Sequence, residues 1–246
     1  GMTTYADLAD ATLALGTMPA VVPQLKSITL GGAVAGVGIE ATSFRQGLVH
    51  DTVVAMDILT GDGRIVRCTA DNEHRDLFRG FPNSYGTLGY ALKLTARTLP
   101  VRRYVHVRHD RHTDATRFFA AVEAACADES ADFVDGVVFG PDEHVLTSGR
   151  FVDDAPYASD YTYERIYYRS LRERHEDYLT ARDYLWRWDT DWFCARRTSV
   201  RSILCCGACS AVTGSTRSRT KGSCAGMPAA AQRRRSIACG ACTPRR

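Results

Sequence analysis

Glycine density marks the stretch of this 246-residue chain whose residue types best fit ligand chemistry. Four glycines, Gly31, Gly32, Gly36 and Gly38, fall within eight positions. Because glycine has no side chain, such a segment lets backbone N–H groups approach a ligand closely, as the cradles around phosphate groups require. The same composition fits a flexible, tightly packed loop that binds nothing, and composition alone favours neither interpretation.

One motif in this segment matches a dinucleotide-binding fingerprint. Gly36-x-Gly38-x-x-Ala41 has the spacing of the Rossmann type, which requires a strand directly before it, a helix directly after it and a parallel second strand. The next strand candidate, Val53–Leu59, is followed by Asp62-Gly63 and a further strand at Arg64–Thr69, a pattern typical of an antiparallel hairpin. We therefore do not expect a Rossmann-type site.

Histidine is the other residue type whose spacing could do chemistry. His106, His109 and His112 are spaced by three residues, which suggests a metal site, but no cysteine or acid accompanies them at metal-ligand spacing. A strand with an exposed polar edge is the favoured interpretation. We expect no metal site, no Ser–His–Asp arrangement can be assigned, and the catalytic residues stay unknown.

Patterns along the first 193 residues predict short helices and strands that could position these groups. Thr4-x-x-Asp7, followed by apolar residues, predicts a capped helix ending at Gly16. The further predicted elements are strands at 28–30, 88–99, 104–108, 134–139 and 145–151, helices at 72–81 and 113–127, and a loop at 82–86. The helix at 113–127 is expected to gather Phe118, Phe119, Val122 and Ala125 on one face.

Charge and cysteine divide the chain into two unequal parts. Residues 1–191 carry all 28 acidic and 20 of the basic side chains, whereas residues 192–246 carry 11 basic side chains and no acid. Only Cys68 and Cys126 precede Cys194, so the main part indicates a reducing compartment and a cytoplasmic location. No apolar run is long enough to span a membrane, and no signal peptide is visible.

The basic tail from Cys194 has three interpretations. Its composition, rich in Arg, Ala, Ser, Gly and Cys, favours a disordered or frame-shifted segment. The pairs Cys206-x-x-Cys209 and Cys239-x-x-Cys242 could hold zinc, but 29 residues separate them, more than a zinc ribbon usually has. Arg233-Arg-Arg235 could bind nucleic acid, but charge alone gives sequence-blind affinity, so no specific nucleic-acid partner is expected.

The order of motifs resembles a known family of flavin enzymes. Thr29-Leu-Gly-Gly-x-x-x-Gly-x-Gly-Ile-Glu40 is followed by Gly63-x-x-Val-Arg-Cys-Thr69, Asp76-Leu-Phe78 and Gly86-Thr-Leu-Gly89. This series, with Pro100-x-x-x-Tyr-Val105 after it, resembles the FAD-binding domain of the vanillyl-alcohol oxidase/p-cresol methylhydroxylase superfamily. Its branch of delta(24)-sterol reductase-like oxidoreductases is the most similar, over about residues 5–193.

The resemblance implies a cofactor, a reaction and a set of binding residues. FAD would be held non-covalently, NADPH would supply electrons, and a carbon–carbon double bond of an apolar, sterol-like substrate would be reduced, with full-length relatives associated with membranes. The competing interpretation is an inactive remnant that binds no cofactor. By resemblance the cofactor-binding residues are Thr29, Leu30, Gly31, Gly32, Ala33, Val34, Ala35, Gly36, Val37, Gly38, Ile39, Glu40, Ala41, Ser43, Gly47, Val53, Gly86 and Gly89.

We therefore expect an α+β fold with three parts. Residues 1–102 would be the second half of the FAD-binding domain, because family members have another subdomain before the point where this sequence starts. Residues 103–193 would be part of a substrate (cap) domain, and residues 194–246 the disordered tail. The aromatic-rich stretch 157–193 suits a flat apolar substrate, although for any single residue a place in the core is the favoured interpretation.

Overall fold

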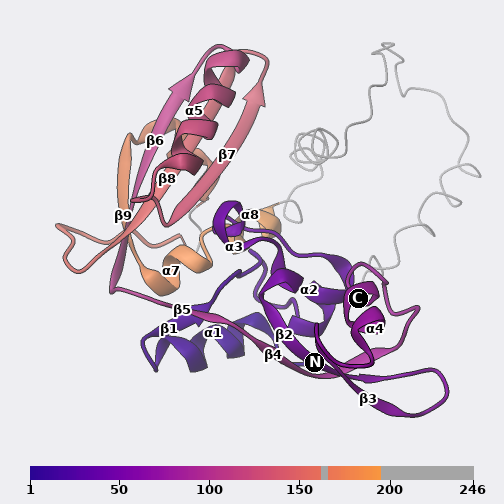
Figure 1. Ribbon diagram of the computed structural model, residues 1–246. Helices are drawn as coiled ribbons and strands as arrows, with labels where there is room; N and C mark the ends of the chain where they lie inside the picture. The colour runs from indigo at the N-terminus through magenta and orange to yellow at the C-terminus, as the bar shows by residue number, and fades with distance from the viewer. Residues whose placement is uncertain (162–165, 195–246) are drawn as a thin grey trace, which may run out of the picture. The chain divides into compact units, whose positions relative to one another are not determined.

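The computed structural model describes residues 1–161 and 166–194, which contain helices and antiparallel sheets in the α+β arrangement that the sequence predicts (Figure 1). The predictions for the tail beyond Cys194, namely disorder or a shifted frame, zinc and nucleic acid, lie outside the described residues. Within those residues, no helix combines the length and the apolar composition that crossing a bilayer requires.

The first helix forms as its capping residues predict. Helix α1 spans Tyr5–Leu13, and the Thr4 side chain accepts a hydrogen bond from the backbone N–H of Asp7. The chain turns at Gly16, whose φ of +73° is a conformation that glycine adopts without strain. It then enters strand β1 (Thr17–Pro19), which pairs antiparallel with strand β5 (Thr98–Pro100).

A three-stranded antiparallel sheet follows in the order β3-β2-β4. Strands β2 (Val53–Leu59) and β3 (Ile65–Cys68) form the hairpin predicted from Asp62-Gly63, and helix α4 (Arg75–Gly80) lies within the predicted range 72–81. The single strand predicted at 88–99 is wrong, because it is two strands in two sheets. Strand β4 (Tyr90–Ala96) pairs with β2, while β5 pairs with β1, and Arg97 between them bonds to the backbone of both Ala20 and Thr52.

The short strand predicted at 28–30 is wrong, because Thr29 forms only an isolated bridge with Thr4 and a helix begins at Leu30. Helix α2 spans Leu30–Gly36, and the Thr29 hydroxyl accepts from the N–H of Gly32 to cap it. The cap and the burial of one face outweigh the low helix propensity of three glycines. Helix α3 (Ser43–Gln46) and the 3₁₀ helix η1 (Val49–Thr52) lead from there to β2.

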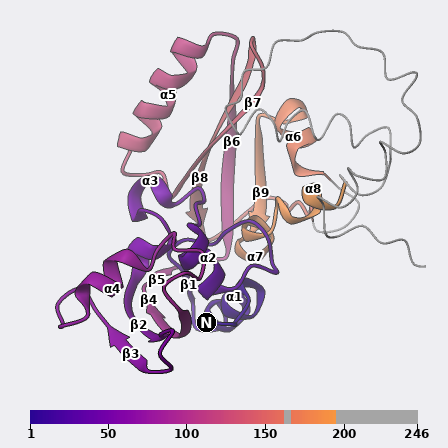
Figure 2. The same ribbon diagram turned by 90° about the vertical axis from the view of Figure 1, so that its right-hand side faces the viewer.

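Residues 104–194 build a four-stranded antiparallel sheet with helices on both faces, in the order β7-β8-β6-β9. Its strands are β6 (Tyr104–His112), β7 (Phe133–Gly140), β8 (Glu143–Val152) and β9 (Glu176–Thr180). Helix α5 (Ala115–Ala127) lies on one face, and α6 (Tyr167–Glu173) and α7 (Ala181–Leu185) lie on the other (Figure 2), with α8 (Asp189–Cys194) after them.

The apolar face expected on α5 is only partly correct. Phe118 is buried against the rings of His112 and His144. Phe119 points to solvent, with 65% of its surface exposed. The reason is geometric, since neighbouring residues on a helix point about 100° apart and only one of two consecutive phenylalanines can face the sheet.

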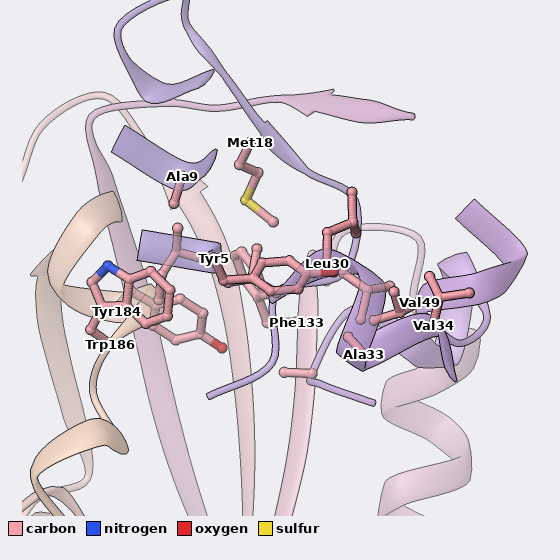
Figure 3. Packing of buried hydrophobic residues seen from close by; sticks show 14 of the residues in the cluster. Tyr5, Ala9, Met18, Leu30, Ala33, Val34, Val49, Phe133, Tyr184 and Trp186 are labelled. Carbon is pink, nitrogen blue, oxygen red and sulfur yellow. The ribbon is translucent and has the colours of Figure 1, made fainter. Parts of the chain in front are cut away.

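One core runs through both groups of elements. Figure 3 shows Tyr5, Met18, Leu30 and Val49 in the same cluster as Phe133, Tyr184 and Trp186. Gly1 to Cys194 belong to one compact unit. The division at residues 102 and 103 therefore stays a prediction, although in the sequence the first group of strands ends with β5 and the second begins with β6.

Candidate functional site

An open groove of about 380 Å³ runs along helix α2. Its walls come from the glycine segment itself and from the loop that precedes it, and six of the predicted cofactor-binding residues line it. The lining residues are Pro23, Ile28, Thr29, Gly32, Ala33, Gly36, Val37 and Gly38. The glycine segment therefore lies beside a groove, and protein covers only part of it.

Helix α2 has one buried face and one open face. Leu30 and Val34 point into the core, where Figure 3 places them near Tyr5 and Val49, and the buried Ala33 lies between the core and the groove. Gly32 and Gly36, four residues apart, lie on the groove side. A Cβ atom at Gly36 would have no neighbour nearer than Tyr85 Cε1 at 4.0 Å, so packing against protein does not require glycine there. The missing side chain instead leaves room in the groove.

Two glycines of the segment have a different role. A Cβ atom at Gly38 would lie 2.7 Å from Val49 Cγ2 and 3.1 Å from Pro23 Cγ, and one at Gly31 would lie 2.8 Å from the carbonyl oxygen of Gly1. These contacts are too close for any side chain to fit. Gly31 and Gly38 are therefore explained by close protein packing and Gly36 by the groove, while a Cβ atom at Gly32 would also lie 3.0 Å from the Thr29 hydroxyl oxygen.

Unusual backbone conformations gather where α2 ends. Val37 has a φ of +63°, which is strained for a β-branched residue, and it lies on the groove. The loop at 82–86 docks against the same end of the helix, since the N–H groups of Asn83 and Tyr85 donate to the carbonyls of Val34 and Ala35 at 3.3 and 3.0 Å. The structure thus brings the predicted Gly86, with a φ of +82°, close to the glycine segment.

The other predicted cofactor residues contact protein here. Ser43 Oγ accepts from the N–H of Glu40 at 3.1 Å, and Val53 is buried in β2. A Cβ atom at Gly47 would lie 2.6 Å from Asp51 Oδ2, and one at Gly89 2.3 Å from the carbonyl oxygen of Leu59. A direct role for these residues in cofactor binding stays a prediction.

A buried charge cluster that includes Glu40, at the end of the glycine segment, was missed by sequence reasoning. Arg187, with 1% of its side chain exposed, pairs through Nη2 with Glu40 Oε1 at 2.7 Å and with Asp135 Oδ2 at 3.1 Å. Its guanidinium also lies 4.0 Å from the centre of the Tyr184 ring. Burial raises the pKa of Glu40, and the nearby Arg187 charge opposes that shift. An arginine between two tryptophans in the sequence was the available signal for a buried cation.

The histidines do not form a metal site, and the exposed polar edge expected for them is wrong. Strand β6 lies inside the sheet between β8 and β9, and both His106 and His109 are buried. His106 Nε2 lies 3.0 Å from Glu176 Oε2, whereas His109 Nδ1 lies 2.9 Å from Thr147 Oγ1 on the opposite face. Burial lowers the pKa of His109 to about 4. Across the described ranges, no group of three metal-binding side chains comes together.

The aromatic stretch is mostly core. Tyr161, Tyr167, Tyr184 and Trp186 are buried in the cluster shared by both groups of elements. Only Tyr157, with 46% of its surface exposed, is a large aromatic residue open to solvent in this stretch of the described chain.

Comparison with known proteins finds a family match over the part of the chain that contains the groove. Residues 3–69 match the family described as FAD binding domain. Relatives include Delta(24)-sterol reductase of Arabidopsis thaliana, 35% identical over 58% of this chain and 27% of that protein, and Delta(24)-sterol reductase of Homo sapiens, 34% identical over 56% and 27%. Cytokinin dehydrogenase 7 of Oryza sativa subsp. japonica is 28% identical over 54% of this chain and 26% of its own length.

The chain thus spans about a quarter of the length of these relatives. The matched residues 3–69 contain the whole glycine segment, helix α2 and all the residues that line the groove. Over residues 3–69 the sequence therefore fits an FAD-binding domain of the p-cresol methylhydroxylase type, the kind found in flavin oxidoreductases.

Proposed function

We propose that this chain binds FAD non-covalently against the glycine segment and takes part in the flavin-dependent reduction of a sterol-like substrate. One observation carries the proposal: within the matched FAD-binding segment, an open groove is lined by three glycines, and at Gly36 the missing side chain leaves it free. Flavin adenine dinucleotide needs such close backbone contact around its phosphates.

The residues present fit part of this cofactor. A groove of about 380 Å³ lies within the usual range of about 300–1,000 Å³ for ligand sites. Gly32 and Gly36 would let the cofactor approach the backbone of α2, and Thr29 would present a hydroxyl beside them. The largely apolar wall formed by Pro23, Ile28 and Ala33 suits the flat rings of a nucleotide.

We propose the chemistry and the substrate from the names of the relatives. FAD, when bound, supplies hydride transfer, and the protein supplies binding and orientation. Because two relatives are named Delta(24)-sterol reductase, we propose a sterol-like apolar substrate whose carbon–carbon double bond is reduced, with NADPH as the electron donor. No side chain of the described residues is assigned as the proton donor. A cytoplasmic location stays a prediction.

Titration of the full 246-residue chain with FAD tests the proposal. Quenching of flavin fluorescence gives the dissociation constant, and visible absorbance retained through gel filtration shows a stable complex. Gly36→Leu would place a side chain in the groove without a clash at its Cβ, so we expect it to weaken binding by about tenfold or more. Gly61→Leu is the matched control, since that glycine lies in the β2–β3 turn with nothing within 4 Å of a Cβ.

The outcomes separate the two interpretations of the chain. FAD binding that Gly36→Leu weakens and Gly61→Leu preserves supports the proposal. A colourless parent chain that does not quench flavin fluorescence contradicts it and supports the interpretation as an inactive remnant.

A further inference from the structure

We infer that Arg187 is a positioning residue for the glycine segment: it holds Glu40 and thereby sets the conformation in which residues 36–38 line the groove. This inference rests on the proposed function for its ligand. It also changes the role of Glu40, which the sequence placed among the cofactor contacts, to that of an anchor within the protein.

The first support is the position of Glu40. It follows the groove-lining Gly38 by two residues, and its side chain reaches Nη2 of Arg187 at 2.7 Å, across 147 residues of sequence. Its own N–H donates to Ser43 Oγ, while Ser43 N–H donates back to the carbonyl of Glu40 at 2.8 Å. Glu40 therefore starts a tight turn whose only side-chain ion pair is with Arg187 among the described residues.

The second support is that the backbone after Glu40 is hydrogen-bonded to β7, the strand that carries Asp135. The N–H of Val134 donates to the carbonyl of Ala41 at 2.9 Å, and Asp135, the next residue, accepts from Arg187. The side chain of Arg45 donates to the carbonyl of Asp128 at 3.0 Å, in the loop before β7. The end of the glycine segment is thus held by contacts from residues 128–187 on several sides.

The third support is that Arg187 itself has little freedom. It is buried, it pairs with two carboxylates, and it lies over the Tyr184 ring. The indole N–H of Trp188 donates to Asp135 Oδ2 at 3.2 Å and fixes the second carboxylate. A cation with this many contacts has little conformational freedom and can hold Glu40 in one position. This matters for Val37, because a strained residue keeps its conformation only when its surroundings determine it.

Three substitutions in the full chain test this inference. Glu40→Ala removes the tie but leaves Arg187 paired with Asp135, so the fold is retained. Glu40→Gln keeps an oxygen that can accept from Arg187 and serves as the rescuing variant. Asp10→Ala is the matched control, because Asp10 accepts from Arg182 of α7 at 2.7 Å but does not touch the glycine segment.

Two readouts distinguish positioning from general stability. Hydrogen exchange without FAD follows the amides of Glu40, Ser43 and Val49, which bond within this region. We expect faster exchange at these amides in Glu40→Ala alone. Flavin titration should show a dissociation constant raised about tenfold in Glu40→Ala, within the range of coupled sites, and changed by less than about twofold in Glu40→Gln and Asp10→Ala.

Each outcome decides the matter. The inference is supported if hydrogen exchange at these amides and FAD affinity both change in Glu40→Ala and both recover in Glu40→Gln. Unchanged exchange at these amides, or equal effects in Glu40→Ala and Asp10→Ala, overturns it. A parent chain that binds no FAD overturns the proposed function, and the exchange result then still decides whether Arg187 positions the segment.

Discussion

The two antiparallel sheets of this protein differ in how much of each is covered. The β3-β2-β4 sheet leaves Ile65, Tyr90 and Leu92 exposed, and the groove opens beside the helix that packs near it. The β7-β8-β6-β9 sheet has helices on both faces, and Val107, Val145 and Leu179 along it are fully buried.

This difference assigns the two regions separate physical roles. The first region presents backbone and small residues to the open groove, which leaves it with few side-chain contacts of its own there. The second region is closely packed and contributes the buried Arg187 that reaches back to Glu40. A groove-lining segment rich in glycine depends on a rigid neighbour, because its own residues supply little packing.

The largest effect should come from the cation that joins the regions. Arg187→Met would leave the carboxylates of Glu40 and Asp135 without their buried partner, so the free energy of unfolding should fall by about 3–5 kcal/mol. Arg182→Met removes an exposed pair with Asp10 and should cost only about 0–1 kcal/mol. Urea unfolding measures the free energy of both variants. Equal losses would contradict the view that the buried Arg187 contributes more to stability than the exposed Arg182.

The next effect compares the same leucine truncation in the two sheets. Leu179→Ala in β9 empties a fully buried site and should lower the free energy of unfolding by about 2–5 kcal/mol. Leu92→Ala in β4 changes a side chain that is 46% exposed, and the free energy should change by less than about 0.5 kcal/mol. A comparable loss in both variants would show that the first sheet is covered in solution.

The free energy of unfolding should depend on pH because His109 is buried in the second sheet. The pKa of His109 is lowered by burial from 6.5 to about 4, so the unfolded chain binds a proton more readily between these values. The contribution of neutral His109 is fully present above pH 6.5 and is lost as the pH falls towards 4, by about 3 kcal/mol in total.

The measurement is the difference in free energy of unfolding between the parent chain and His109→Gln at pH 7 and at pH 4. The difference is needed because burial raises the pKa of Asp191 to about 6, which gives an opposite slope over part of the same range. We expect the parent to lose about 3 kcal/mol relative to the variant. A constant difference across this range would mean that His109 is accessible to solvent.

The smallest effect compares two helix caps of the same type. Thr4 and Thr29 each accept from the backbone N–H three residues later, at 3.2 and 3.1 Å. Replacing either by alanine should lower the free energy of unfolding by about 1 kcal/mol. Only Thr29→Ala should also raise the dissociation constant for FAD, since Thr29 lines the groove and Thr4 does not. Identical FAD affinity in both variants would remove Thr29 from the site.

Local signals predicted the elements whose hydrogen bonds are short-range. Asp62-Gly63 indicated the β2–β3 hairpin, and Thr4-x-x-Asp7 indicated the start of α1, because turn and cap geometry depend on a few neighbouring residues. The strand expected at 28–30 was wrong because three glycines hide the period of a helix that tertiary packing stabilises. The strand at 88–99 was split because β1, 79 to 83 residues earlier, pairs with its second half.

The sequence by itself indicated an FAD-binding domain, since the order of its glycine motifs is a property of the chain, and residues 3–69 match the family of that description. Only the tertiary structure decided which glycines face a groove and which pack against protein, because that depends on atoms such as Val49 Cγ2 and Tyr85 Cε1 brought from other elements. It also decided that Glu40 pairs with Arg187, because a contact across 147 residues leaves no periodic signal and forms only when both regions share one core.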